Sequence, residues 1–258
     1  MTKQLLKTVF STFIWIYYII LFVLFFPFVL LIYLVTLPFD RYQTVANRFF
    51  MQMARFMMYI NPGWRIKFYD LDKLVVGKGT IYVANHQSFM DLPLLALLPG
   101  TVKWVSKKSL FKIPVLGWMI KMAGHLSIDR KKKTAIKRLD NLVEPLKDGI
   151  TVMIFPEGTR SLDGELKSFR NGAFLLAEKH NFRLQPIVTE GTRQLLPSHS
   201  WVFEPSQPIQ VHVLDPIEPE NYSSVSELRN ATHEAMKNKL EAIRETESNR
   251  HSLHSEPA

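Results

Sequence analysis

The stretch Ile81–Asp91 (IYVANHQSFMD) joins a four-residue apolar run to a polar cluster, and an apolar helical pattern follows it at Leu92–Leu98. A short apolar run before a helical pattern is typical of a buried strand that turns into a helix. Asp91 suits the start of that helix, and Pro93 suits its first turn, where a missing N–H costs nothing. The sequence therefore predicts a strand-turn-helix unit that carries His86 and Asp91 on its turn.

His86 and Asp91 lie five positions apart on this predicted turn. A turn can fold a carboxylate against an imidazole, and the carboxylate then fixes the tautomer and stabilises the imidazolium. We therefore predict that His86 is a general base and that Asp91 is its partner. Spacing alone is weak support, because His199 and Glu204 have the same separation. His86 is favoured because it follows a predicted strand, where functional groups of α/β sheets gather.

Strand and helix patterns alternate from Trp64 onward. Six apolar runs predict strands, at Ile66–Tyr69, Ile81–Ala84, Val102–Val105, Thr151–Phe155, Leu184–Val188 and Ile209–Val213. Helical patterns lie between them at about residues 92–98, 111–123, 134–147 and 171–180. This alternation predicts an α/β fold, with a layered αβα domain over residues 64–225. A charged helix and a disordered tail are expected to form residues 226–258, with the helix ending near Glu247.

The N-terminal segment contains no charged residue from Thr8 to Phe39. This run is far longer than the apolar region of a signal peptide, and no small-residue cleavage site follows it. Residues 1–40 are therefore predicted to be a membrane-embedded helical anchor. A helix of this run's 32 residues would be about 48 Å long, whereas the hydrocarbon core of a bilayer is about 30 Å thick.

Two topologies suit this length: a tilted single span kinked at Pro27, or a hairpin that breaks at Pro27 and returns to the same face. The hairpin is favoured by the positive-inside rule, because it keeps Lys3, Lys7 and the arginines after the run on the cytoplasmic side. The catalytic domain would then lie on the cytoplasmic face of the membrane.

Residues 41–63 are predicted to form an amphipathic interfacial helix. Its apolar side chains recur at helical spacing, and Arg41, Arg48 and Arg55 recur every seven residues on one polar stripe. Two arrangements fit this pattern. The helix could pack on the core with a solvated polar face, or it could lie in the membrane interface with its arginines toward lipid phosphates.

The net charge of +9 is unevenly distributed. Residues Thr101–Arg138 contain eleven lysines and arginines, and Asp129 is their only acidic residue. This basic field indicates an anionic partner, such as phosphate groups, anionic lipid, an acidic carrier protein or nucleic acid. The absence of cysteine excludes disulfides, thiolate metal sites and a cysteine nucleophile. The histidines show no metal-ligand spacing, so no metal is predicted.

A second polar cluster, FPEGTRS at residues 155–161, follows the predicted strand that begins at Thr151. Gly158 permits a tight turn, and Arg160 can bind a phosphate through two parallel hydrogen bonds. An ordinary polar turn with a structural Glu157–Arg160 pair fits the same letters. A second Glu-Gly-Thr-Arg run lies at residues 190–193, and spacing does not decide which of the two binds phosphate.

The blocks NHQSFMD, KKSLFKIPVLGW, IDR, FPEGTRS and QPIV occur in this order between about residues 80 and 190. They resemble the blocks of the 1-acyl-sn-glycerol-3-phosphate acyltransferase family. The resemblance implies a layered α/β domain at a membrane surface, with His86 as the base and Asp91 as its partner. It further implies that the first Glu-Gly-Thr-Arg run binds the acceptor phosphate and that the second only lines the site. The implied substrate-binding residues are Glu157, Gly158, Thr159, Arg160, Lys108 and Arg130, and the implied supporting residues are Asn85, Ser88, Pro156 and Pro186.

The resemblance implies a reaction that moves a fatty acyl group from an acyl thioester to the free hydroxyl of lysophosphatidic acid, giving phosphatidic acid. The donor would be acyl-CoA or acyl carrier protein, with no separate cofactor, no metal and no nucleic acid. Backbone N–H groups at the start of the Leu92 helix are candidates for holding the oxyanion. One alternative changes the acceptor to glycerol 3-phosphate, a lyso-ornithine lipid or another lysolipid. The other is a non-catalytic basic protein of membrane surfaces or nucleic acid, which leaves the His86–Asp91 pair and the FPEGTRS cluster unexplained.

Overall fold

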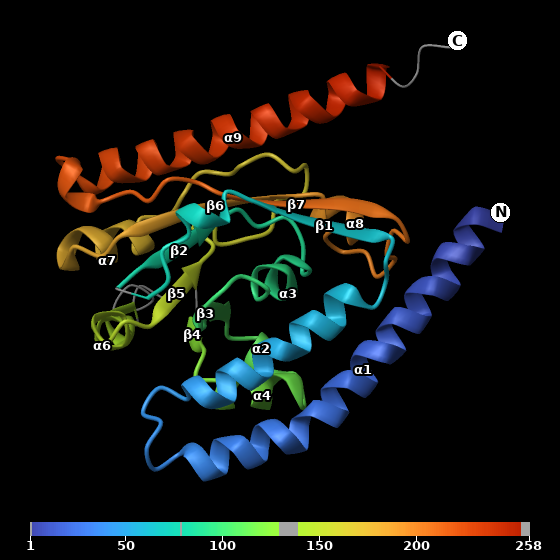
Figure 1. The fold of residues 1–258 in the computed structure, drawn as a ribbon, viewed down its shortest axis with the longest axis horizontal. Helices are drawn as coiled ribbons and strands as arrows, with labels where there is room; N and C mark the ends of the chain where they lie inside the picture. Colours follow the sequence, from blue (N-terminus) through green and yellow to red (C-terminus); the bar gives the residue numbers. More distant parts are fainter. Residues whose placement is uncertain (1, 78, 129–138, 254–258) are drawn as a thin grey trace.

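The computed structural model describes residues 2–77, 79–128 and 139–253 of the chain (Figure 1). At its centre is a seven-stranded sheet with the strand order β1-β7-β6-β2-β5-β3-β4. The strands are β1 (Trp64–Tyr69), β2 (Ile81–Ala84), β3 (Val102–Lys107), β4 (Leu126–Ile128), β5 (Thr151–Ile154), β6 (Leu184–Glu190) and β7 (Gln207–Val213). The five strands from β6 to β4 are parallel, whereas β7 runs antiparallel to β6 and pairs with β1 in parallel.

Helices cover both faces of this sheet (Figure 1). One face packs against α6 (Val143–Lys147), α7 (Gly172–His180) and α9 (Val225–Leu253). The other face packs against α1 (Thr2–Thr36), α2 (Thr44–Tyr59), α3 (Asp91–Leu95) and α4 (Leu116–Met122). Short helices complete the described chain: α8 (Thr192–Leu195) and the 3-10 turns η1 (Leu71–Lys73), η2 (Leu110–Lys112), η3 (Asp140–Leu142) and η4 (Pro219–Asn221). The predicted layered αβα class is confirmed.

The continuous apolar run of β2 has a direct structural explanation. All four of its residues are fully buried, and successive side chains of a strand point to opposite faces. Tyr82 and Ala84 therefore enter the core under α1 and α2, while Ile81 and Val83 enter the core under α7 and α9. Because helices cover both faces, the strand needs no polar side, as is usual for central parallel strands.

Several elements differ from the prediction. β4 and α8 were not predicted, because three or four residues are too few to show a period. The helix expected over residues 111–123 begins as the turn η2, and α4 starts only at Leu116, after Pro114 has interrupted the pattern. α9 continues to Leu253, beyond the expected end at Glu247. The last five residues of the expected tail and the first part of the helix expected over 134–147 lie outside the described residues.

α1 is one continuous helix from Thr2 to Thr36 and passes through Pro27 without a break. The hairpin expected inside this apolar run is therefore wrong, because the chain does not turn back at Pro27. It turns only after Thr36, and α2 then runs back beside α1 (Figure 1). In the part of the chain that the structure describes, α1 is the one helix long and apolar enough to cross a membrane.

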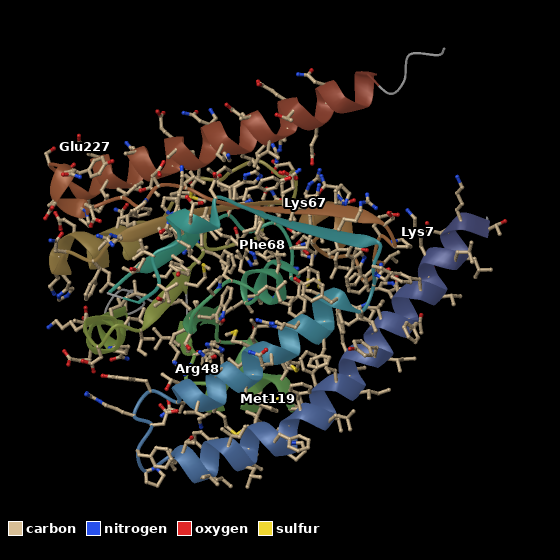
Figure 2. All side chains as sticks on the ribbon, in the orientation of Figure 1. Lys7, Arg48, Lys67, Phe68, Met119 and Glu227 are labelled. Atoms are coloured by element: carbon tan, nitrogen blue, oxygen red, sulfur yellow. The ribbon has the colours of Figure 1, made fainter. Side chains whose placement is uncertain are left out.

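One face of α1 is packed against the rest of the protein along most of its length. Near the N-terminus, Lys7 forms an ion pair with Glu204 at 2.5 Å, and Figure 2 shows Lys7 beside the end of the sheet. Farther along, the buried Tyr18 hydroxyl donates to the Met57 carbonyl oxygen of α2 at 2.9 Å. The ring of Phe26 contacts that of Trp118 in α4, with 5.7 Å between centroids, and continues this packing toward the C-terminal end of α1. The helix is therefore part of the protein's core on one side.

The other face of α1 is apolar and exposed, with side chains that project away from the protein (Figure 2). A contiguous apolar surface of this kind marks an interaction site. Because it runs along one face of a helix, it suits contact with the apolar region of a membrane. Its exposed large side chains are Leu5, Leu6, Val9, Phe13, Ile16, Ile19, Ile20, Val23, Leu24, Phe28, Leu31, Leu34 and Val35.

Candidate active site

The candidate residues meet at the carboxyl ends of four neighbouring parallel strands. β2 leads into the turn at residues 85–91, hereafter the catalytic turn, and β5 leads into the turn at residues 155–161, hereafter the phosphate turn. β2 lies between β5 and β6, and β3 lies on the far side of β5. Ligands of open α/β sheets bind outside the carboxyl ends of the strands, so this edge is the expected place for a site.

The structure contains the expected contact between His86 and Asp91. Nδ1 of His86 lies 2.8 Å from Oδ2 of Asp91, which is completely buried. The same oxygen accepts the backbone N–H groups of Gln87 at 2.7 Å and Ser88 at 2.9 Å. Because the carboxylate oxygen can only accept a hydrogen bond, Nδ1 of the neutral ring carries the proton and Nε2 carries the lone pair.

The His86 ring is oriented so that Nε2 can act as a base. The ring stacks on Phe155 with 4.1 Å between centroids and 15° between planes. Nε2 has no hydrogen-bond partner among the described residues, and His86 lines a cavity. The other residues that line this cavity include Phe89, Leu92, Lys107, Leu110, Thr159 and Arg160. A neutral imidazole nitrogen facing a cavity can take a proton from a bound hydroxyl.

The phosphate turn is bonded directly to the backbone of His86. Oε1 of Glu157 accepts the His86 N–H at 2.8 Å, and the Ser161 N–H donates to the His86 carbonyl oxygen at 2.7 Å. The second carboxylate oxygen of Glu157 accepts the Lys167 N–H at 3.2 Å. Glu157 is 5% exposed, so the structure places this expected substrate-binding side chain inside the protein, in support of the catalytic turn.

Burial raises the pKa of Glu157 to about 7, against the opposing effect of the two backbone N–H donors, from His86 and Lys167. The folded state therefore binds this proton more tightly than the unfolded state, whose value is near 4.5. The resulting contribution to stability is fully present below pH 4.5 and is lost as the pH rises to about 7.

We therefore expect Glu157→Gln to remove this pH dependence. Between pH 4.5 and 7.5, the melting temperature of the wild type should fall relative to that of the variant by roughly 5 °C. Thermal unfolding across this pH range measures the difference. Glu245→Gln, at an exposed position of α9, is the control and should follow the wild type. Parallel curves for wild type and Glu157→Gln would contradict the prediction.

Within the phosphate turn, Thr159 is exposed and Arg160 is half-buried, whereas the rest of the turn is buried. Gly158 has φ +74°, and a Cβ there would lie 2.5 Å from Nε of Arg170, so only glycine fits. Thr159 and Arg160 line the same cavity as His86. The guanidinium of Arg160 has no hydrogen bond or ion pair with any described residue. The backbone carbonyl oxygen of Arg160 accepts a hydrogen bond from Nζ of Lys167 at 2.9 Å. Arg160 is therefore available to bind an anion.

Asn85 and Ser88 tie the catalytic turn to neighbouring segments. The Asn85 side chain accepts the Thr189 N–H at 2.7 Å and donates to the Thr189 carbonyl oxygen at 2.8 Å, which extends the pairing of β2 with β6. The Ser88 hydroxyl donates to the Leu196 carbonyl oxygen at 2.7 Å. Both side chains are buried, so they support the site and do not line it.

Each of the two expected prolines accepts a backbone hydrogen bond at its carbonyl oxygen. The Pro156 carbonyl oxygen accepts the Arg170 N–H at 2.9 Å, and the Pro186 carbonyl oxygen in β6 accepts the Leu214 N–H at 3.0 Å. Neither proline lines the cavity of His86.

Of the two expected basic residues outside the phosphate turn, only Lys108 is described, and it does not line the cavity of His86. Lys108 is exposed just after β3, and its neighbour Lys107 lines the cavity in its place. Arg130 lies outside the described residues, as do Lys131, Lys132 and Lys133.

Sequence reasoning missed the role of the second Glu-Gly-Thr-Arg run. Oγ1 of Thr192 donates to Oδ1 of Asp91 at 2.5 Å, so this run contacts the catalytic pair directly. The repeated letters after a parallel strand were the available signal. Backbone N–H groups at the start of the Leu92 helix were expected to hold the oxyanion. The N–H of Leu92 itself does not suit this role, because it already donates to the Phe89 carbonyl oxygen at 3.3 Å.

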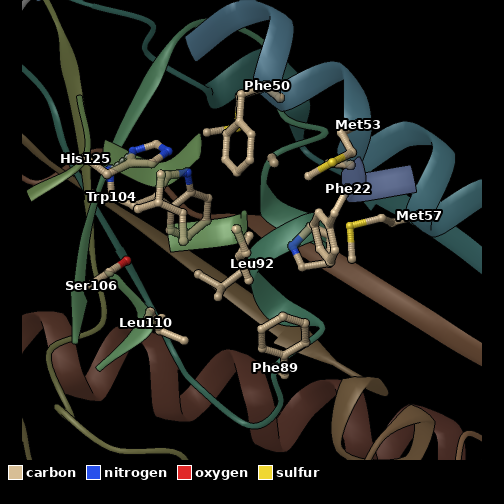
Figure 3. Close-up of a pocket in the computed structure, with 16 residues that line it drawn as sticks. Phe22, Phe50, Met53, Met57, Phe89, Leu92, Trp104, Ser106, Leu110 and His125 are labelled. Atoms are coloured by element: carbon tan, nitrogen blue, oxygen red, sulfur yellow. Dashed lines mark hydrogen bonds between the residues drawn. The ribbon is translucent and has the colours of Figure 1, made fainter. Parts of the chain in front are cut away.

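An apolar pocket adjoins the cavity of His86 (Figure 3). It shares Phe89, Leu92, Ser106 and Leu110 with that cavity and extends between α2, α3, β3 and α4. A third cavity, lined by apolar side chains of α1 and residues 110–116, also includes Phe89 and Leu110. Ile19 of α1 lines it and belongs to the exposed face of the helix. The three cavities share lining residues and therefore lie next to one another between that face and His86.

Among the residues described by the structure, no three His, Cys, Asp or Glu side chains are placed to hold a metal ion.

Comparison with known proteins agrees with this geometry. A sequence model of the family described as Acyltransferase matches residues 65–190, which include both turns. An acyltransferase of Schizosaccharomyces pombe is 31% identical over 187 residues, which are 70% of this chain and 67% of that protein. The chain belongs to the acyltransferase family.

Two further relatives of this acyltransferase have more specific names. A 1-acyl-sn-glycerol-3-phosphate acyltransferase of Chlamydomonas reinhardtii is 37% identical over 164 residues, 63% of this chain and 49% of that protein. The chain thus spans about half the length of that relative. The crystal structure of the 1-acyl-sn-glycerophosphate (LPA) acyltransferase PlsC from Thermotoga maritima matches with a TM-score of 0.74 at 25% identity, over 92% of this chain and 98% of that one. The family expected from the motifs is confirmed.

Proposed function

We propose that this acyltransferase moves a fatty acyl group from an acyl thioester to the free hydroxyl of 1-acyl-sn-glycerol 3-phosphate and so forms phosphatidic acid. The observation that carries the proposal is that His86 and Arg160 line one cavity. Among the described residues, neither Nε2 of His86 nor the guanidinium of Arg160 has a hydrogen-bond partner. A base beside a cation suits an acceptor that has both a hydroxyl and a phosphate. The names of the relatives support this acceptor.

In the proposed reaction, Nε2 of His86 takes the proton from the acceptor hydroxyl. The oxygen attacks the carbonyl carbon of the thioester, the C–O ester bond forms and the C–S bond breaks. The departing thiolate takes the proton from the imidazolium, which returns His86 to its neutral form. Asp91 stabilises the positive charge on the ring between these two proton transfers. The step needs no covalent intermediate on the protein.

The acyl chain of the donor fits the apolar pocket next to His86. Its lining is apolar except near Ser106 and His125 (Figure 3). Burial lowers the pKa of His125, and its Nδ1 accepts the Trp104 N–H at 3.1 Å, so this histidine is neutral and places no charge beside the chain. The carrier is coenzyme A or acyl carrier protein, and Lys107 at the cavity suits the anionic groups of either one.

The geometry of α1 supports a position at the surface of one membrane leaflet. One face of the helix is packed on the protein from Lys7 to the α4 contacts, so lipid cannot surround it. Its exposed apolar face would enter the bilayer, and Arg48 and Arg55 of α2 lie exposed on the same helical pair. We infer that this surface faces the cytoplasm, because the anionic lipids of the cytoplasmic leaflet would attract the two arginines. The cavity between α1 and residues 110–116 would admit the lipid acceptor laterally.

The proposal is tested with the purified full-length protein and radiolabelled acyl donors. The acceptors are lysophosphatidic acid, glycerol 3-phosphate, lyso-ornithine lipid and a monoacylglycerol, and each is assayed with acyl-CoA and with acyl carrier protein. We expect the highest kcat/KM with lysophosphatidic acid. Activity confined to a phosphate-free acceptor would refute the acceptor, and no transfer in any combination would favour a non-catalytic protein.

Arg160→Gln is expected to raise the KM for lysophosphatidic acid by roughly 10- to 100-fold, because it removes a charged hydrogen bond to the phosphate. A phosphate-free acceptor should show little change, since it never makes this bond. Steady-state kinetics with both acceptors measure the two effects. Arg65→Gln, at an exposed position of β1, is the matched control. Equal losses with both acceptors would show that Arg160 does not bind the phosphate.

A further inference from the structure

We propose that Thr192 is a positioning residue for acyl transfer, because it holds the Asp91 carboxylate in the orientation that His86 requires. The inference rests on the function proposed above. It gives the second Glu-Gly-Thr-Arg run, hereafter the bracing turn (Glu190–Arg193), a role that is separate from phosphate binding.

The hydrogen bonds of Asp91 carry the argument. Oδ2 accepts hydrogen bonds from His86, Gln87 and Ser88, all of which lie on the catalytic turn. Oδ1 accepts the Thr192 hydroxyl at 2.5 Å, and this contact comes from a segment 101 residues away. Both side chains are completely buried, so water does not substitute for the hydroxyl. Among the described residues, the Thr192 hydroxyl is the one hydrogen-bond donor to Oδ1.

The bracing turn is itself held in place. Gly191 has φ +94°, and a Cβ there would collide with the Pro208 carbonyl oxygen of β7. The Glu190 carboxylate is 3% exposed and accepts Nε of Arg244 in α9 at 3.2 Å. Its same oxygen lies 3.4 Å from Nε2 of Gln87, which belongs to the catalytic turn. The bracing turn is therefore bonded to α9 on one side and to the catalytic turn on the other.

Arg244 extends this contact into the segment that follows the phosphate turn. Its guanidinium donates to the Gly164 carbonyl oxygen at 2.6 Å and to the Glu165 carboxylate at 2.8 Å. The position of Thr192 is thus set by two parts of the fold, α9 and residues 164–165. Removing the Thr192 hydroxyl would leave a buried carboxylate oxygen without its donor and would free the carboxylate to rotate.

This rotation would matter most when charge develops on His86. Asp91 only selects the tautomer of the neutral ring. The imidazolium depends on it more, because the fixed carboxylate stabilises its positive charge. A loss of orientation should therefore lower kcat and leave the KM for either substrate close to that of the wild type.

The experiment compares the kcat and KM of Thr192→Val, Thr192→Ser and Thr232→Val by varying the concentration of the acceptor that the wild type uses best. Thr232 is the matched control, because it is also completely buried and its hydroxyl donates to the Leu228 carbonyl oxygen at 2.8 Å within α9. Thr192→Val should lose roughly 10- to 100-fold in kcat, with KM unchanged. Thr192→Ser should recover most of this loss, and Thr232→Val should keep wild-type kcat.

Three results would overturn the inference: a kcat of Thr192→Val within twofold of the wild type, an equal kcat loss in Thr232→Val, or no recovery in Thr192→Ser despite a wild-type melting temperature. Failure of the proposed function would be seen in the wild type itself, as an absence of acyl transfer. Failure of the inference is seen only in the ratio of a variant's kcat to the kcat of an active wild type.

A second comparison tests the connection to α9. Arg244→Met should lower kcat less than Thr192→Val, because Glu190 keeps its contact with Gln87. The double variant should lose no more than Thr192→Val alone, since both changes act through the same carboxylate. Losses that multiply would show that α9 does not act through Thr192.

Discussion

Replacing His86 by alanine is expected to lower kcat by roughly 10³- to 10⁴-fold, the upper part of the range for a general base. Nε2 of His86 has no hydrogen-bond partner among the described residues and can take the acceptor proton, while Nδ1 lies 2.8 Å from Asp91. Without the ring, the hydroxyl has to lose its proton to water, which is a much weaker base. Membrane association should be unchanged, because the exposed face of α1 does not include His86.

The measurement is acyl transfer by purified variants in lipid vesicles, together with flotation of the protein with those vesicles. His180→Ala is the matched control, because that ring also stacks on a phenylalanine, Phe182, with 5.5 Å between centroids. It should keep wild-type activity. A His86→Ala enzyme with more than a tenth of wild-type kcat would show that the base has been misassigned.

Asp91→Asn is expected to lower kcat by roughly 10³-fold while the fold is retained. Asparagine has almost the same shape, and its amide oxygen can take the place of Oδ2, where it would accept the N–H groups of Gln87 and Ser88. The amide NH₂ would then face Thr192, whose hydroxyl can rotate to accept it. Only the negative charge beside the imidazolium is lost.

The opposite orientation of the amide is disfavoured. It would point the NH₂ at two backbone N–H groups and would force His86 into the wrong tautomer. A melting temperature near that of the wild type, combined with the loss of kcat, is therefore the expected result. Asp72→Asn, at an exposed position in η1, is the control. Full activity in Asp91→Asn would contradict a role for the charge.

The sequence predicted the layered fold and the catalytic turn because these depend on short-range patterns. The apolar run Ile81–Ala84 and the helix signals at Asp91 and Pro93 are read within a dozen residues, and β2 has its predicted bounds. The pairing of His86 with Asp91 follows from the same turn. These features needed no knowledge of distant contacts.

Contacts across long sequence separations were not predictable in this way. The residues Glu-Gly-Thr-Arg are the same in both turns, yet their threonines differ in contacts. Thr159 lines the cavity together with Arg160, whereas Thr192 donates to Asp91. The direction of Glu157 depends on the backbone of His86, 71 residues away. In each case the neighbouring strand, rather than the local sequence, decides what the side chain contacts.

The topology of α1 shows another limit. A proline in an apolar run can break a helix or bend it, and Pro27 does not break this one. The outcome depends on the side chains that pack along the helix, such as Tyr18 on α2 and Phe26 on α4. Those partners are not visible in the pattern of the run itself.

The packing of α1 has a thermodynamic consequence. Ile14, Tyr18 and Val29 are fully buried in the same core as Tyr82 of β2, so the helix that meets the bilayer is also part of the catalytic domain's interior. A bilayer that binds the exposed face of the folded helix then acts as a ligand of the native state, and mass action stabilises every element packed on that core. Membrane binding and the stability of the catalytic turn are therefore linked equilibria.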